Sequence, residues 1–215
     1  MDEPATEVRR AAVRLAALAQ DGLTYSVGDP TKDYDSARYQ EISAIAAALL
    51  STISTIPVPE LRLLLGRDTG YATPKVDVRA GVLDEQERFL LLRERSDGRW
   101  SLPGGWADPG DRLGFAVERE VLEETGFPVE AVKLVAVWDR DVRGKTPPLP
   151  VAVFHLFFLC RVSGSPVPAA DLETLEVGWF GLDELPELSA SRVNRFELER
   201  VLAHHRDSSL PTEWD

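Results

Sequence analysis

The sequence predicts an α+β fold with an all-helical segment in front of it, and two patterns support this fold class. Up to about residue 70, apolar residues recur at helical spacing, as at Val8, Ala12 and Leu15. From Val76 to Val82, apolar and polar residues alternate, which is the period of a β-strand. Further strands around a central helix, with another helix at the end, indicate a mixed α and β domain.

Three helices are expected in the first part of the chain. The first covers about residues 4–20, and the turn-rich stretch "DGLTYSVGDPTKDYDS" ends it. A second helix runs from Ser36, a residue type that can cap it, to about Ile53, and "VPELRLLLG" forms a short third helix. Many of these positions are apolar nearly all round, which predicts burial against another surface.

The second part of the chain alternates between strands and helices. One helix is expected at about residues 112–125, and a last amphipathic helix at about 191–205. We expect a helical domain (1–70), a larger α+β domain (71–207) and a polar tail (208–215). Further strands are expected at residues 88–95, 99–103, 130–139, 150–162 and 174–181.

Composition narrows the class of protein. The 215 residues carry a formal net charge of −12, which disfavours binding to nucleic acid or anionic lipid. The longest apolar run, residues 149–160, is shorter than the ~20 residues of a membrane-spanning helix. The N-terminal "MDEPATEVRR" lacks the apolar core of a signal peptide. Cys160, the one cysteine, is expected to be a buried thiol in a cytoplasmic protein.

The stretch "PGGWADPGDRLGFAVEREVLEETGF" predicts a tight loop followed by a helix. Asp111 is a good N-cap residue for this helix. Gly126 stands where a left-handed residue ends a helix. The glycines of the loop allow backbone carbonyls to come close to the side chains of the helix.

Glu120, Glu123 and Glu124 share one side of this helix at positions i, i+3 and i+4. Like charges at this spacing repel by about 0.2–0.5 kcal/mol per pair. A solvated acidic surface is one explanation of such a cluster. The other is a metal site, because several oxygen ligands on one rigid face suit Mg²⁺ or Mn²⁺, and the cation cancels the repulsion.

The same stretch resembles the signature of the Nudix hydrolases. The resemblance implies a mixed sheet sandwiched by helices, and hydrolysis of a nucleoside diphosphate linked to another group X. Asp111 stands where the family usually has glutamate, a carboxylate that tends to pair with the arginine of the signature. The matching residues are Gly105, Asp111, Arg119, Glu120, Val121, Glu123, Glu124, Gly126 and Phe127.

The resemblance also implies roles for individual residues. Glu120 and Glu124 would be the principal metal ligands, and Glu123 would ligate directly or through water. The carbonyl of Gly104 would be a backbone ligand, and Arg119 would orient the glutamates.

Motifs outside the signature resemble a Nudix subgroup with an added N-terminal helical domain. Among them are "TGYATPKVDVRAGV", "WSLPGGWADPG" and "EVGWFGLDELPELS". Members of this subgroup are described as ADP-ribose or CDP-choline pyrophosphatases. The resemblance implies a homodimer formed through the N-terminal helices, which would reach over the site of the partner.

The general base is left open between a glutamate of the helix, Glu123 or Glu120, and an acid on a distant loop. Glu173 is the loop candidate, and an exposed turn acid is the alternative explanation for it. The base would take a proton from the attacking water.

Several cations and one aromatic residue are candidates for substrate contacts. Arg79 lies on the polar side of its strand, Lys75 precedes that strand, and Arg95 ends the next one. They would hold phosphates, with an ordinary surface charge as the alternative. Trp106 would stack on a base, and packing explains it equally well.

Two other functions remain open. A nucleotide-binding regulator would keep the fold without the chemistry, but such relatives usually lose signature acids that this chain retains. A hydrolase of RNA ends or an exonuclease is disfavoured by the negative charge. The sequence has no GxxxxGK[ST] or HExxH motif.

Overall fold

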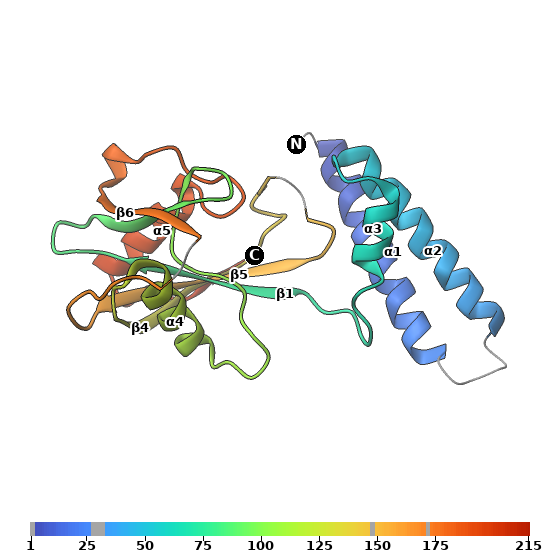
Figure 1. The fold of residues 1–215 in the computed structure, drawn as a ribbon, viewed down its shortest axis with the longest axis horizontal. Helices are drawn as coiled ribbons and strands as arrows, with labels where there is room; N and C mark the ends of the chain where they lie inside the picture. Colours follow the sequence, from blue (N-terminus) through green and yellow to red (C-terminus); the bar gives the residue numbers. More distant parts are fainter. Residues whose placement is uncertain (1–2, 27–32, 147–148, 171–172) are drawn as a thin grey trace. The chain divides into compact units, whose positions relative to one another are not determined.

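The computed structural model describes residues 3–26, 33–146, 149–170 and 173–215. The chain divides into two compact units (Figure 1). One comprises residues 1–75 and 146–152, and the other comprises residues 76–145 and 153–215. No helix among the described residues is long and apolar enough to cross a membrane.

The first unit consists of three helices, α1 (Glu3–Ser26), α2 (Asp33–Ile53) and α3 (Val58–Leu65), drawn in blue to cyan in Figure 1. They pack around a small apolar core that includes Ala12, Leu50 and Leu61. The prediction of a helical first part is therefore confirmed.

The predicted end of the first helix and the predicted start of the second are wrong, whereas the predicted end of the second at Ile53 is confirmed. Helix α1 continues to Ser26, and in its last turn the hydroxyls of Thr24 and Ser26 donate to the carbonyls of Gln20 and Gly22. Helix α2 begins at Asp33, so Ser36 lies within the helix and does not cap it. Residues 27–32 of the predicted turn lie outside the described residues.

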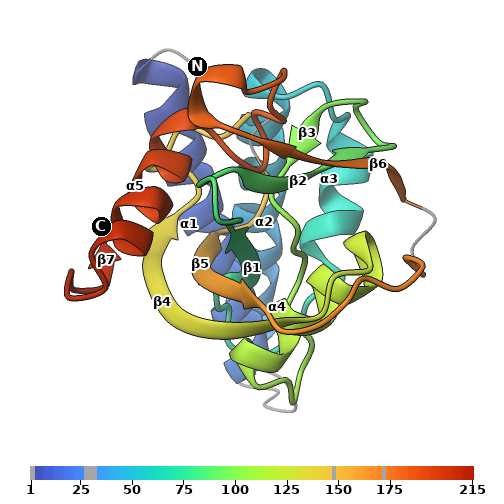
Figure 2. The ribbon, with the colours of Figure 1, turned by 90° about the vertical axis from the view of Figure 1, so that its left-hand side faces the viewer.

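The second unit contains two sheets. The four-stranded sheet has the order β1-β5-β4-β7, and the three-stranded sheet has the order β3-β2-β6 (Figure 2). Their strands are β1 (Lys75–Val82), β2 (Phe89–Glu94), β3 (Trp100–Ser101), β4 (Val129–Asp139), β5 (Val153–Val162), β6 (Thr174–Phe180) and β7 (Glu213–Trp214).

Two main helices of this unit, α4 (Leu113–Thr125) and α5 (Arg195–Arg206), cover opposite faces of the four-stranded sheet. Alternate residues of β5 separate the two cores. Phe157 shares a core with α5, whereas Phe158 shares the other with α4. A short helix, η2 (Leu182–Glu184), follows β6. The α+β fold class is confirmed.

The end of the chain is more structured than a polar tail. Helix α5 begins only at Arg195, because Asn194 and Glu197 form a capping box. Strand β7 then pairs in parallel with β4. Ion pairs from Arg200 to Glu213 and from Arg143 to Asp215 hold this segment in place.

The interior of the second unit confirms one prediction about a single residue. Cys160 is a buried thiol, and burial raises its pKa to about 12, so it stays protonated. His155 is buried as well. Burial and the charge of Arg79 lower the pKa of its imidazole to about 2, so the ring is neutral.

We expect the substitution Gly22→Ala to destabilise the helical unit. The opposite would follow from helix propensity alone, because alanine within a helix is about 0.5–1 kcal/mol more favourable than glycine. A Cβ at Gly22 would lie 2.4 Å from ring atoms of Tyr39. Overpacking of this kind costs about 1–3 kcal/mol, which urea unfolding followed by circular dichroism measures. The control is Gly114→Ala in α4, where a Cβ would meet nothing closer than 3.9 Å. A stabilising effect at both positions would contradict the packing of α1 on α2.

Candidate active site

The loop before α4 runs beside β1 and is fixed by backbone hydrogen bonds. The amide of Val78 donates to the carbonyl of Gly105 (2.8 Å), and the amide of Ala80 donates to that of Pro103 (2.9 Å). Gly104 lies between these contacts with φ of +144°. A Cβ there would lie 2.0 Å from the carbonyl oxygen of Val78, so the close approach requires glycine.

The two ends of α4 give one correction and one confirmation. The N-cap is Arg112, without a side-chain hydrogen bond, so the prediction that Asp111 caps the helix is wrong. The carboxylate of Asp111 instead accepts from Arg119 Nη2 at 3.2 Å, so the shorter acid still reaches the arginine. Gly126 ends the helix with φ of 76°, as predicted.

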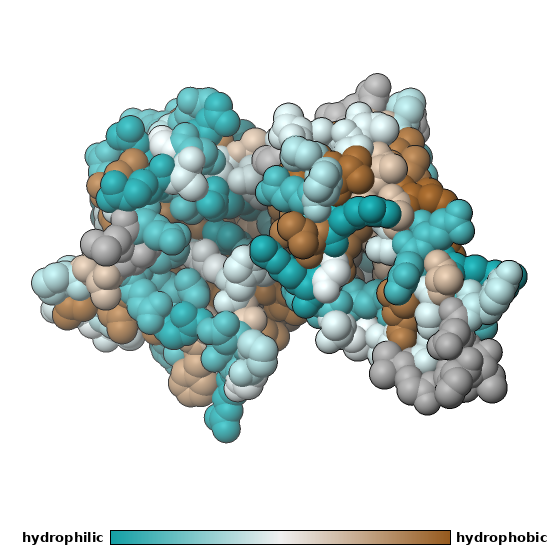
Figure 3. Space-filling view, turned by 45° about the vertical axis from the view of Figure 1, so that its right-hand side comes forward, coloured by the Kyte–Doolittle hydropathy of each residue, from teal (hydrophilic) through white to brown (hydrophobic). Residues whose placement is uncertain are grey.

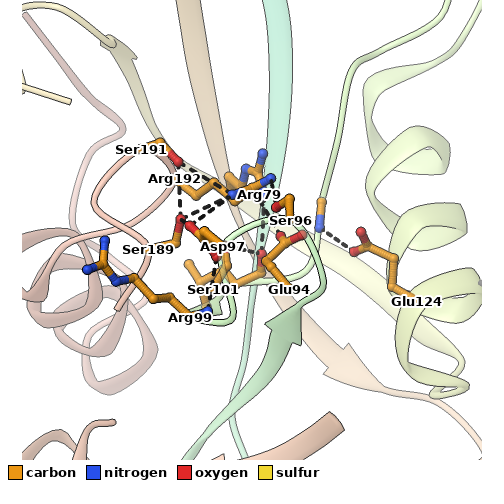
Figure 4. A network of polar contacts seen from close by, with 12 residues as sticks. Arg79, Glu94, Ser96, Asp97, Arg99, Ser101, Glu124, Ser189, Ser191 and Arg192 are labelled. Atoms are coloured by element: carbon orange, nitrogen blue, oxygen red, sulfur yellow. Dashed lines mark hydrogen bonds and ion pairs between the residues drawn. The ribbon is translucent and has the colours of Figure 1, made fainter. Parts of the chain in front are cut away.

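Two of the three helix glutamates face the glycine loop. Oε2 of Glu124 accepts a hydrogen bond from the amide of Gly104 (2.8 Å), which Figure 4 shows. The side chain of Glu120 is 14% exposed, whereas that of Glu123 is 50% exposed. Arg119 Nη1 lies 2.8 Å from Glu120 and 3.3 Å from Glu123. The arginine therefore ties the buried carboxylate to the exposed one.

The two facing carboxylates are short of positive charge. Burial raises the pKa of Glu124 to about 8, and the charges of Glu120 and Glu94 contribute, against the Gly104 amide and Arg79. Burial and the charge of Glu123 raise the pKa of Glu120, although Arg119 opposes this. A cation placed between the carboxylates would relieve both costs.

The donor set fits a hard divalent cation, because it offers carboxylate oxygens beside a backbone loop. Across the described part of the chain, no three acidic, histidine or cysteine side chains are grouped closely enough to hold a metal ion. Glu120 and Glu124 alone would make up only part of a coordination shell, of the kind that Mg²⁺ completes with water, and their role as metal ligands stays a prediction.

Arg79 is buried, with 5% of its surface exposed. Its Nε and Nη2 each donate to Asp77 at 2.7 Å, and its Nη1 donates to the carbonyl of Leu102 at 3.3 Å. Burial acts to lower its pKa, but the charges of Asp77, Glu124 and Glu94 raise it further. The guanidinium therefore stays charged beside the site, while its contact with a phosphate stays a prediction.

The remaining predicted residues lie in varied surroundings. Lys75 is exposed and pairs with Asp68 at 3.2 Å. The amide of Arg95 donates to the carbonyl of Glu173 at 2.8 Å, where the β2 end meets the start of β6. Trp106 is 51% exposed. None of the contacts just described joins these side chains to the helix glutamates, so their roles stay predictions.

Glu94 and Arg192 are the residues that the sequence analysis missed. Glu94 is the last residue of β2 and is 7% exposed. Its Oε1 lies 2.9 Å from Nε of Arg192. Strand alternation could have found Glu94, because it puts this acid on the same face as the buried Leu90 and Leu92.

Comparison with known proteins now identifies the family. A family model described as the NUDIX domain matches residues 73–200. The chain belongs to the Nudix family. A second model, described as the UDP-X-like, N-terminal oligomerisation domain, matches residues 6–65. The chain is thus a Nudix hydrolase of the subgroup with added N-terminal helices, and Nudix hydrolases generally use divalent metal ions.

Several relatives share much of the chain. YjhB of Bacillus subtilis, named as a candidate ADP-ribose pyrophosphatase, is 33% identical over 205 residues, 95% of each chain. The crystal structure of an ADP-ribose pyrophosphatase from Streptococcus suis is 36% identical, with a TM-score of 0.59, and covers 66% of this chain and 100% of its own. The crystal structure of a UDP-X diphosphatase is 26% identical, with a TM-score of 0.59. The match covers 98% of this chain and 99% of the UDP-X diphosphatase chain.

We expect Gly105→Ala to weaken cation binding without unfolding the protein. A Cβ at this position would lie 2.9 Å from Oε2 of Glu120, and the flexible carboxylate would move away. Changes to groups that orient a metal ligand typically lower metal affinity by about 10–100-fold, and we expect a loss of this size in calorimetric titration with Mn²⁺. The control is Gly181→Ala, since a Cβ at Gly181 meets nothing within 4 Å. Equal Mn²⁺ affinities of Gly105→Ala and Gly181→Ala would contradict the assignment of Glu120 as a cation ligand.

Glu124→Gln should stabilise the cation-free protein. A raised carboxyl pKa means that the folded state binds more protons than the unfolded state, so stability falls as the pH rises from about 4.5 to about 8. Glutamine removes this penalty, and we expect a gain of at least about 1 kcal/mol at pH 7, since one pKa unit corresponds to about 1.4 kcal/mol. Urea unfolding in EDTA at pH 5 and pH 8 measures the difference, which should be larger at pH 8.

The half-exposed Glu123 provides the comparison for this experiment. Glu123→Gln makes the same change of charge one residue away and should alter stability by less than about 0.5 kcal/mol. A pH-independent effect of Glu124→Gln would show that burial of the charge is not its cause.

Proposed function

We propose that this chain is a Mg²⁺-dependent pyrophosphohydrolase that splits ADP-ribose into AMP and ribose 5-phosphate. The observation that carries the proposal is the pair of Glu120 and Glu124, which face the Gly104 loop while Arg119 holds Glu120. The names of the Bacillus and Streptococcus relatives support the choice of ADP-ribose.

Glu120, Glu124 and the carbonyl of Gly104 would hold the cation. When bound, Mg²⁺ supplies positive charge for the diphosphate and lowers the pKa of water. Arg119 positions Glu120 and Glu123, and the charged Arg79 offsets part of the negative charge behind them.

The general base is proposed to be Glu123 or Glu173. Glu123 lies at the exposed edge of the glutamate cluster, where water has access to it. Burial raises the pKa of the Glu94 carboxyl, and Glu173 lies near enough for its charge to add to this rise. Replacing the base by glutamine lowers kcat by about 10²–10⁴-fold and leaves KM nearly unchanged.

Lys75, Arg95 and Trp106 remain proposed substrate contacts. The two cations would bind phosphate oxygens, and the exposed indole would stack on a nucleobase. The cytoplasmic location predicted from composition likewise stays a prediction.

A UDP-linked substrate is the second candidate. The structure of a UDP-X diphosphatase matches both units, covering 98% of this chain. CDP-choline, the substrate implied by the resemblance of the sequence motifs, is the third. All three share the diphosphate and differ in the base and in X.

The deciding experiment identifies the products chromatographically. The pure protein is incubated with Mg²⁺ and ADP-ribose, UDP-sugars, CDP-choline or a 5′-triphosphate RNA. We expect AMP and ribose 5-phosphate, and a loss of at least about 10²-fold with Glu124→Gln. Cleavage of RNA alone would favour a hydrolase of RNA ends, and ligand binding without cleavage would favour a regulator.

We also propose a homodimer formed by the N-terminal helices. The match to an oligomerisation domain supports it. Apolar side chains are exposed on this unit, among them Leu18, Ile45 and Leu63, and Figure 3 shows apolar residues on its surface. We expect light scattering to give twice the 23.8 kDa chain mass. A Leu63→Glu variant should shift toward the monomer, whereas a monomeric wild-type protein would refute the dimer.

A further inference from the structure

Glu94 is a buried carboxylate that the proposed chemistry does not use. It ends β2 on the face of Leu90 and Leu92, which are fully or almost fully buried. Where β2 pairs with β6, Arg93 lies opposite Glu176 and Glu94 lies opposite Thr174, so the extra residue of this irregularity is on β6 and Glu94 keeps the alternation of its own strand. Since burying a charge is costly, a carboxylate held at this position requires a reason.

Arg192 holds this carboxylate in place. Its Nε lies 2.9 Å from Glu94 Oε1, while its other nitrogens donate to Ser189 (3.1 Å) and Ser96 (3.2 Å). Asp97 lies 3.5 Å from the same guanidinium. Figure 4 shows this network of polar contacts around Arg192. The guanidinium is therefore constrained on several sides, and Glu94 is a fixed acceptor.

Glu94 belongs electrostatically to the glutamate site. Its charge contributes to the raised pKa of Glu124, and Arg79 interacts with both carboxylates. In Figure 4, Glu124 reaches the site from α4, and Glu94 lies beside Arg79. The two carboxylates thus come from different elements, and the charge of Arg79 acts on both.

The chemistry of Glu94 limits what it can bind in a substrate. An ionised carboxylate only accepts hydrogen bonds, and so does a diphosphate, so the two repel. Its partners must be donors in the organic groups on either side of the diphosphate. Two neighbouring hydroxyls can donate to a single carboxylate, and they are the donors that a ribose offers.

We propose that Glu94, positioned by Arg192, binds the paired hydroxyls of a ribose in the substrate and thereby selects ribose-containing nucleotides. The inference rests on the proposed function for the location of the diphosphate. The ribose is either that of the nucleoside or the terminal sugar of ADP-ribose, and the chemistry of recognition is the same.

Binding calorimetry in Mg²⁺ tests this assignment with ligands that are not split. One arm compares ADP with 2′,3′-dideoxy-ADP, which reports on the nucleoside ribose. The other compares methylene-bridged ADP-ribose with methylene-bridged ADP, which reports on the terminal ribose. In one of the two arms, we expect the wild type to bind the ligand without the ribose hydroxyls about tenfold more weakly than the ligand with them. For Glu94→Gln, the same difference in affinity should be less than about threefold.

The matched control is Glu176→Gln, which removes the same charge from the neighbouring strand β6. Glu176 is exposed and lies 3.6 Å from Arg93, and this variant should discriminate like the wild type. Arg192→Lys keeps the charge but not the planar fork, and should reduce the discrimination while Glu94 is retained.

Three outcomes would overturn the assignment. If wild type and Glu94→Gln distinguish ligands with and without the hydroxyls equally well in both arms, Glu94 is only a structural partner of Arg192. Its replacement would then change stability in urea unfolding and leave ligand binding unchanged. Loss of Mn²⁺ affinity in Glu94→Gln would make it a cation ligand. Absence of hydroxyl discrimination in the wild type would exclude ribose recognition. The cleavage assay is independent of these binding measurements. A protein that distinguishes ligands by their ribose hydroxyls but does not cleave ADP-ribose would therefore refute only the proposed function.

Discussion

The hydrogen bond from the Gly104 amide to Glu124 is the contact on which the rest of the site depends. It joins the loop beside β1 to the last turn of α4, two segments 20 residues apart in the chain. The loop can occupy this position only because Gly104 has no Cβ to meet the carbonyl of Val78. The bond also favours the charged form of a carboxyl whose burial favours the neutral form. The close contact of Glu124 with the loop thus shapes the site, and the burial of the Glu124 charge is its electrostatic cost.

That cost explains why the arginines of the site already pair with carboxylates. Arg79 is occupied by Asp77 and by the carbonyl of Leu102. Arg119 is shared between Asp111 and the helix glutamates. Both cations therefore organise carboxylates, and a chain with net charge −12 needs another source of positive charge for an anionic substrate. In the proposed function, a divalent cation between Glu120 and Glu124 provides it.

Local patterns predicted the elements of the fold, whereas contacts between distant segments decided the details. Alternation predicted β1 and helical spacing predicted α4, because each pattern reflects the burial of one face. Local pattern could not decide whether Asp111 caps α4 or pairs with Arg119, since both roles suit an aspartate at that position, and only the resemblance to the signature indicated the pairing. The strand at Glu213–Trp214 forms only because β4 offers an edge, which no local pattern reveals.

Glu94 illustrates the same limit within the site. Its alternation with Leu92 indicates an inward-facing residue, but its importance comes from Arg192, 98 positions later, and from Glu124 on another element. The resemblance to the Nudix signature draws attention to α4, because the metal chemistry of the family is concentrated there. Strand β2, which carries Glu94, and the loop before α5, which carries Arg192, lie outside that signature. In the proposed function, the glutamates of α4 serve the diphosphate that all candidate substrates share, so selectivity for the organic part of a substrate has to come from residues outside the signature.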